Sequence, residues 1–262
     1  MKEEMIIKKK KKKKFKIKNI VLVIFMFLFF LLFIFSLIKI VNYTKDNKSN
    51  KNIEKIVKEA IKINDDKVDH RTTIDKKYEV DFNALKNENS DTVAYLKVLG
   101  TNIDYVILKG KDNDYYLHHS FDKSYNVLGW PFADYHNKFD GTDKNIVIYG
   151  HDVKTGVMFG SLKKVLTEEW QKDEGNRKII FKTEKESGIY EVFSTYTIDP
   201  EDYYITTNFK NEDDYEQFLN KIRFRSNKVY GVSVTTDDSI LTLSSCTNSG
   251  TKRVVLHAKK VQ

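Results

Sequence analysis

The chain has 262 residues, of which 45 are lysine or arginine and 37 are acidic, and its formal net charge is +8. It holds one cysteine, which excludes an internal disulfide. The charge does not indicate nucleic-acid binding, because it is concentrated near the N-terminus and the remainder of the chain is close to neutral.

The N-terminal region has the pattern of an uncleaved membrane anchor. Lysines fill positions 8–14, and residues 20–38 hold no charge and are rich in Phe, Leu, Ile and Val. That run is long enough to cross a hydrocarbon core of about 30 Å as a helix. Because lysines favour the cytoplasmic side, we predict a cytoplasmic N-terminus at 1–19, a single transmembrane anchor at 20–41 and an extracellular C-terminal part. A cleaved signal peptide is the alternative, but residues 37–43 lack an Ala-x-Ala cleavage pattern.

A polar linker is expected at residues 42–52, followed by one folded domain at 53–262. The domain begins with a predicted amphipathic helix, whose apolar residues follow helical spacing: Ile53, Ile56, Val57, Ala60 and Ile61. A second short helix is predicted at 82–86. A domain of about 200 residues can be stabilised by its hydrophobic core without disulfides.

From residue 93 onward the pattern changes to short β-rich runs separated by turn signals. The predicted strands are 93–98, 104–108, 127–133, 145–149, 178–183, 189–198, 239–245 and 253–260. Eight short strands in one domain predict a mainly β fold, a closed or nearly closed antiparallel barrel. A short helix or turn at 112–118 and a short helix at 159–166 are expected between the strands.

One longer helix is predicted between the sixth and seventh strands, at 211–225. Asn211 can cap it, and acidic residues follow in its first turn. Its apolar residues repeat at helical spacing: Tyr215, Phe218, Leu219 and Ile222. We expect this helix to form one wall of a groove.

The lone cysteine, Cys246, follows a strand-like run and is flanked by polar, loop-like residues. A structural cysteine is the alternative interpretation. A thiol nucleophile needs an imidazole and an oxyanion stabiliser. His151 ends an apolar strand after Gly150, where it is well placed to face a cleft. Arg253 follows Cys246 after a short loop and is the candidate oxyanion stabiliser. The alternative interpretation is an arginine on the surface at the end of a strand. His257 alternates within the last strand and is expected to be a barrel-wall side chain.

These positions together resemble the sortases, the membrane-anchored cysteine transpeptidases of Gram-positive bacteria. The residues concerned are Thr-Leu-Ser-Ser-Cys at 242–246, Arg253, and Tyr-Gly-His at 149–151. The resemblance spans about residue 53 to the C-terminus and is greatest for class B, because of the N-terminal helical extension, the stretch at 115–121 and the helix at 211–225. The departures are Ser245 where threonine is usual, and a loop after Cys246 that lacks an aromatic residue many class B members have.

The resemblance implies an eight-stranded sortase-like barrel and a two-step transpeptidation. Cys246 would attack the threonine carbonyl of a C-terminal sorting motif in a secreted protein, and His151 would act as general acid and then base. Arg253 would bind the oxyanion or the substrate backbone. We also expect Ser244 and Ser245 to bind substrate. An amine of a peptidoglycan precursor would resolve the thioester, and no metal or other cofactor is expected.

Three alternatives remain open from the sequence. A pilin-polymerising sortase would transfer the acyl group to another protein, and a hydrolytic cysteine peptidase would transfer it to water. A membrane-tethered β-barrel without catalytic activity would only bind cell-wall or protein ligands. The complete set of Cys246, His151 and Arg253 argues against the last of these.

Overall fold

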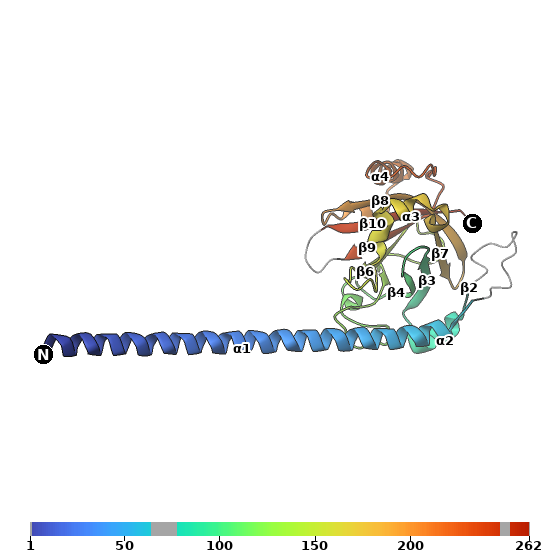
Figure 1. Cartoon of the computed structure of the whole chain (residues 1–262). Helices are drawn as coiled ribbons and strands as arrows, with labels where there is room; N and C mark the ends of the chain where they lie inside the picture. The colour runs from blue at the N-terminus through green and yellow to red at the C-terminus, as the bar shows by residue number, and fades with distance from the viewer. Residues whose placement is uncertain (1, 64–77, 247–251, 262) are drawn as a thin grey trace. The chain divides into compact units, whose positions relative to one another are not determined.

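The computed structural model describes residues 2–63, 78–246 and 252–261, and the chain divides into two compact units, Met1–Lys48 and Ser49–Gln262. Helix α1 (Lys2–Glu59) begins in the first unit and ends in the second (Figure 1). It is the one helix of the described residues that is long and apolar enough to cross a membrane, with a mean hydropathy of 3.3 in its most apolar window. Residues 42–52, expected to be a linker, are helical.

The C-terminal end of α1 packs on the barrel as an amphipathic helix. Ile53 and Val57 are buried, whereas Ile56 is exposed. Ile61 lies outside the helix, in strand β1 (Ile61–Ile63), which pairs antiparallel with β2 (Tyr78–Val80). This pair of strands has no counterpart among the predicted elements. Helix α2 (Phe82–Glu88) follows, and its N-cap is the carboxylate of Asp81, which accepts a hydrogen bond from the Ala84 N–H.

Eight strands form a closed barrel, as predicted. They are β3 (Thr92–Val98), β4 (Asp104–Leu108), β5 (Phe132–Ala133), β6 (Asn145–His151), β7 (Lys178–Thr183), β8 (Ser187–Ile198), β9 (Ile240–Cys246) and β10 (Arg253–Lys260). Their order around the barrel is β10-β8-β7-β3-β4-β5-β6-β9, and β9 pairs with β10 to close it. The expectation of a wholly antiparallel barrel is wrong, because β4 pairs with β5 and β6 pairs with β9 in parallel.

The third barrel strand is shorter than predicted. The sequence predicts a strand over 127–133, but β5 covers only Phe132–Ala133. The backbone turns before it: Gly129 has a φ of 57°, and its N–H donates to the Asn126 carbonyl. Pro131 then offers no N–H to a neighbouring strand. The predicted strand therefore begins as a turn.

Apart from the longer α4, the remaining elements between the barrel strands are short helices. The 3-10 helices η3 (Tyr115–Leu117) and η4 (Leu162–Leu166) fall within the two segments predicted as short helices or turns. Helix α3 (Glu168–Lys172) and the 3-10 helices η5 (Glu174–Arg177) and η6 (Tyr203–Ile205) were not predicted.

Helix α4 (Glu212–Phe224) lies between β8 and β9, the sixth and seventh barrel strands, as predicted. The Asn211 side chain caps it by accepting a hydrogen bond from the Asp214 N–H. Figure 1 shows α4 beside β8. Its apolar face is buried in one cluster with barrel residues, whose members include Tyr215, Phe218, Leu219 and Ile222 from α4 and Phe193, Tyr196 and Val255 from β8 and β10. The groove wall expected here stays a prediction.

Candidate functional site

Three predicted residues lie at strand ends on one edge of the barrel, and the strand pairing explains why. β6 and β9 run parallel, with His151 and Cys246 as paired residues at their C-terminal ends. β10 runs antiparallel to β9, with Val255 opposite Ser244. β10 begins at Arg253, so its first residue lies toward the end of β9 that finishes at Cys246. The parallel pair thus brings together residues that lie far apart in the sequence.

The glycine before His151 allows a large ring to pack against the strand. A Cβ atom at Gly150 would lie 2.6 Å from the ring of Phe159. The Phe159 N–H donates to the His151 carbonyl at 2.9 Å, which closes the turn that follows β6. Any larger residue at position 150 would push Phe159 away and disturb the backbone of His151.

The imidazole of His151 is largely buried and is held by a backbone carbonyl. Its Nε2 atom lies 2.8 Å from the carbonyl oxygen of Leu117, the last residue of η3. A carbonyl only accepts hydrogen bonds, so this contact assigns a proton to Nε2. The ring is thereby fixed in orientation and tautomer, which is what an orienting group supplies to a catalytic histidine.

Arg253 is half-buried and is held by a phenol. Its Nη1 atom donates to the Tyr204 hydroxyl at 3.2 Å. That hydroxyl is also 2.9 Å from the Oγ atom of Ser244, and Tyr204 is completely buried in η6. The guanidinium is therefore anchored through Tyr204 to β9, the strand that ends in Cys246.

The two serines expected to bind substrate have internal partners. Ser244 is buried and contacts Tyr204, and the hydroxyl of Ser245 accepts a hydrogen bond from the Val254 N–H at 2.9 Å. The second contact joins β9 to β10 beyond the last backbone pair. Substrate binding by Ser244 and Ser245 stays a prediction.

Three of the other described histidines, His119, His136 and His257, have side-chain partners. His257 is fully buried between the Tyr196 and Thr242 hydroxyls, and burial lowers its pKa to about 3. It is thus a neutral side chain of the barrel wall, as predicted. His119 stacks on Tyr115, and His136 contacts Asp134. Residues 2–63, 78–246 and 252–261 contain no group of three or more His, Cys, Asp and Glu side chains that could hold a metal ion.

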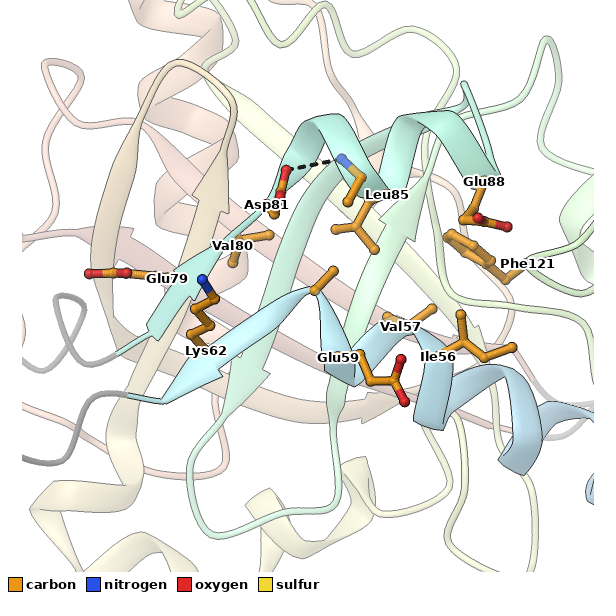
Figure 2. A pocket seen from close by; sticks show the side chains of 12 residues that line it. Ile56, Val57, Glu59, Lys62, Glu79, Val80, Asp81, Leu85, Glu88 and Phe121 are labelled. Atoms are coloured by element: carbon orange, nitrogen blue, oxygen red, sulfur yellow. Dashed lines mark hydrogen bonds between the residues drawn. The ribbon is translucent and has the colours of Figure 1, made fainter.

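A pocket of about 420 Å³ lies between the end of α1, β2 and α2 (Figure 2). Apolar side chains such as Val57, Val80 and Leu85 line it, together with Phe121 from the loop after η3. Its lining includes neither His151 nor Arg253, so it is separate from the site at the end of β6 and β9.

Two groups of the site have no signal in the sequence that predicts their role, for different reasons. The contribution of Leu117 is a backbone carbonyl, which every residue possesses, so no side-chain pattern could indicate it. Tyr204 lies in a tyrosine-rich segment, but its partners Ser244 and Arg253 lie 40 and 49 residues later in the chain. The two consecutive tyrosines of η6 were the only available signal.

Known proteins similar to this chain are sortases. Residues 96–261 match the family model described as the sortase domain. Sortase B of Listeria monocytogenes is 38% identical over 166 residues, which cover 62% of this chain and 65% of that protein, slightly under two thirds of its length. Sortase B of Staphylococcus aureus is 34% identical over 184 residues, which cover 69% of this chain and 75% of that protein.

Solved structures agree with these sequence matches. The X-ray structure of Clostridium perfringens sortase B has a TM-score of 0.65 and 35% identity, and the match covers 70% of this chain and 100% of that one. The crystal structure of sortase B from B. anthracis has a TM-score of 0.71 and 33% identity, covering 85% of this chain and 99% of that one.

Proposed function

The chain belongs to the sortase family, in its class B, and we propose that it is a cell-envelope cysteine transpeptidase whose acyl carrier is Cys246. One observation carries the assignment of the residues: the parallel register of β6 and β9 pairs His151 with Cys246 at the same edge of the barrel. Cys246 is the only cysteine in the chain, so no other residue can supply a thiolate.

In the first step the thiolate of Cys246 attacks the carbonyl carbon of the scissile peptide bond. The C–N bond breaks, and His151 gives a proton to the leaving amine, so that a thioester remains on the enzyme. In the second step an amine attacks the thioester, His151 takes the proton of that amine, and the C–S bond breaks. The new peptide bond leaves with the acceptor, and the thiolate is restored.

The hydrogen bonds around the site support distinct roles for His151 and Arg253. Because Nε2 of His151 donates to the Leu117 carbonyl, Nδ1 is the ring atom that exchanges the proton in this mechanism. Arg253 donates N–H groups to the oxyanion that forms at the substrate carbonyl. Its anchorage to Tyr204 restricts the guanidinium before substrate arrives, which reduces the reorganisation needed in the transition state.

The substrates that fit this function are secreted proteins with a C-terminal sorting motif, and the acceptor is an amine of a peptidoglycan precursor. The apolar part of α1 would hold the enzyme in the membrane with its N-terminus in the cytoplasm and the barrel outside. A pilin-polymerising sortase would use the same chemistry with a protein amine as acceptor.

The function is tested with the full chain in detergent micelles, a sorting-motif peptide from a secreted protein encoded beside it, and triglycine as the amine. Mass spectrometry should detect cleaved peptide carrying triglycine, and release of free acid alone would instead identify a hydrolytic peptidase. Cys246→Ala should abolish turnover, and His151→Ala should lower kcat by at least about 100-fold. His136→Ala, a change at an exposed histidine, is the matched control. Turnover that survives Cys246→Ala and His151→Ala contradicts the proposal.

A further inference from the structure

The end of α1 is joined to the loop after η3 by one buried asparagine. Asn50 is 1% exposed and belongs to the same compact unit as the barrel. Its carboxamide oxygen accepts hydrogen bonds from the Ser120 hydroxyl and, at 3.0 Å, from Asn126 Nδ2. Its amide nitrogen donates to the Gly129 carbonyl at 3.4 Å. Ser120, Asn126 and Gly129 all lie in the segment 115–130, called here the 115–130 loop.

The 115–130 loop also carries the carbonyl that holds the imidazole of His151. Hydrogen bonds within the loop fix the residues on either side of Leu117: the Asn126 N–H donates to the His118 carbonyl at 2.8 Å, and the Trp130 N–H donates to the Tyr116 carbonyl at 3.0 Å. The position of the Leu117 oxygen therefore depends on how the two halves of the loop are held against each other.

Gly129 connects these two sets of contacts directly. A Cβ atom built on Gly129 would lie 2.8 Å from the Leu117 oxygen and 2.4 Å from the Tyr116 oxygen. The backbone of Gly129 thus packs against the carbonyl that contacts His151. Any shift of Gly129 that follows the loss of its hydrogen bond from Asn50 is passed to Leu117 without an intervening side chain.

We propose that Asn50 is a positioning residue for His151, acting through Gly129 and the Leu117 carbonyl. The consequence is that docking of the α1 end is part of what makes the site competent: when Asn50 is in place, the acceptor for Nε2 is in place. This inference rests on the proposed function, because it assigns to His151 a proton transfer that depends on the tautomer and orientation of the ring.

Loss of Asn50 should leave the loop attached to the barrel, because α2 supports it independently. Nδ2 of Asn89, which follows α2, donates to the Phe121 carbonyl at 2.6 Å and to the Tyr116 hydroxyl at 3.1 Å. The Tyr116 hydroxyl in turn donates to Asp91. Figure 2 shows the Phe121 ring between Glu88 of α2 and Ile56 of α1. An altered loop position, and not an unfolded domain, is the expected result of removing the Asn50 side chain.

The test compares Asn50→Ala with Asn52→Ala in the full chain. Asn52 is the same residue type on the same helix, but it is exposed. Asn50→Ala should lower kcat about tenfold with little change in KM, since small misplacements of a proton-transfer group have effects of this order. The limb of the pH–rate profile that reports loss of the imidazolium proton should move to lower pH, because the imidazolium loses a well-placed acceptor. Asn52→Ala should change neither.

A second pair of variants tests the same contact from the loop. Ser120→Ala removes a donor to Asn50, and Ser124→Ala on the same loop removes an exposed hydroxyl that donates to Asp122. Ser120→Ala should reproduce part of the loss in kcat, and the double variant of Asn50 and Ser120 should lose less than the two single losses combined. Ser124→Ala should have no effect. If Asn50→Ala fails to fold, Ser120→Ala decides: unchanged kcat and an unchanged pH profile overturn the inference.

A readout without turnover separates this inference from the proposed function. In protein with isotope-labelled histidine, the nitrogen NMR signal of His151 Nε2 should shift in Asn50→Ala and not in Asn52→Ala. If wild-type protein turns over no substrate but the Nε2 signal still shifts in Asn50→Ala, only the proposed function is contradicted. Wild-type protein that is active, with an Asn50→Ala variant that matches it in kcat, pH profile and Nε2 signal, overturns the positioning role.

Discussion

At the scale of single residues, the two proposed charge-handling groups of the site each contact a neutral acceptor. His151 contacts the Leu117 carbonyl, and Arg253 contacts the Tyr204 hydroxyl. Neither acceptor neutralises its partner, as a carboxylate would. A phenol orients a guanidinium without adding a negative charge beside it, and a carbonyl orients an imidazole in the same way. Both arrangements suit groups that must change partners during the reaction.

Tyr204→Phe tests the orientation of Arg253. The change removes one acceptor of the guanidinium and the partner of the Ser244 hydroxyl, while the ring still fills the same buried space. We expect kcat/KM to fall about tenfold, which corresponds to about 1.4 kcal/mol of transition-state stabilisation. Steady-state kinetics and the rate of Cys246 alkylation are measured together, and the alkylation rate should stay near that of the wild type because the thiol itself is unchanged.

Tyr135→Phe is the matched control for this prediction. It also removes a phenolic hydroxyl, but from an exposed tyrosine. Equal kcat/KM values for wild type and Tyr204→Phe would show that Tyr204 has no part in orienting Arg253. A fall in Tm without a fall in kcat/KM would assign Tyr204 to stability alone.

At the scale of the elements, local patterns predicted most of the barrel. The strands at 104–108, 178–183 and 253–260 agree with the structure residue for residue, because each is a β-rich run bounded by turn signals. Helix α4 was predictable from the cap at Asn211 and the spacing of its apolar residues. These features depend on short-range preferences that one segment shows by itself.

Long-range pairing was beyond such patterns. A strand pattern does not reveal whether its neighbour is parallel, so the pairing of His151 with Cys246 could not be read from the runs that contain them. Similarly, residues 42–52 are polar and were expected to be a linker, but Asn50 in this segment is buried by contacts with residues about 70 positions later. Asn50 is polar because it takes part in a buried hydrogen-bond network. Composition alone does not show whether a polar residue is buried in such a network or exposed to solvent.

We expect Glu54, near the end of α1, to make the stability of the fold dependent on pH. Burial raises the pKa of Glu54 above its ordinary value of 4.5, although the Tyr105 hydroxyl and the nearby Lys58 and Lys51 oppose this shift. An acid with a raised pKa in the folded state destabilises the fold when it is ionised. This penalty is absent below pH 4.5, grows as the pH rises through the folded-state value, and is complete above it.

Glu54→Gln should therefore raise Tm by a few degrees at pH 8, and the gain should disappear as the pH falls toward 4.5. Glutamine keeps the shape of the side chain and can still accept from Tyr105, so the change isolates the charge. Thermal unfolding of the full chain is followed at several pH values. Glu59→Gln, at an exposed position of the same helix, is the control and should show no such trend. A gain for Glu54→Gln that is equal at pH 4.5 and pH 8 contradicts this explanation.

At the scale of the whole molecule, the proposed function requires the barrel to face the compartment in which secreted proteins emerge. The features that bear on orientation are the lysines at 8–14 and the uncharged run at 20–38. Charged lysines resist transfer across the membrane, so a block of them before an apolar span favours a cytoplasmic N-terminus. The proposed acyl carrier is also the only cysteine in the chain, so thiol labelling of Cys246 shows on which side of the membrane the barrel lies.

A membrane-impermeant maleimide should label the wild-type chain on intact cells and should not label Cys246→Ser. Lys10→Cys combined with Cys246→Ser supplies the opposite report, because a thiol at position 10 should react only after the membrane is permeabilised. Replacing the lysines at 8–14 with glutamine should lower the fraction of chains labelled at Cys246 on intact cells, since the charge that favours a cytoplasmic N-terminus is reduced. Labelling after denaturation in detergent gives the total thiol in each sample and corrects for expression. If the thiol of Lys10→Cys is labelled on intact cells, and Cys246 is labelled only after permeabilisation, the orientation is the opposite of the one proposed. The barrel would then lie on the side of the membrane away from its proposed substrates.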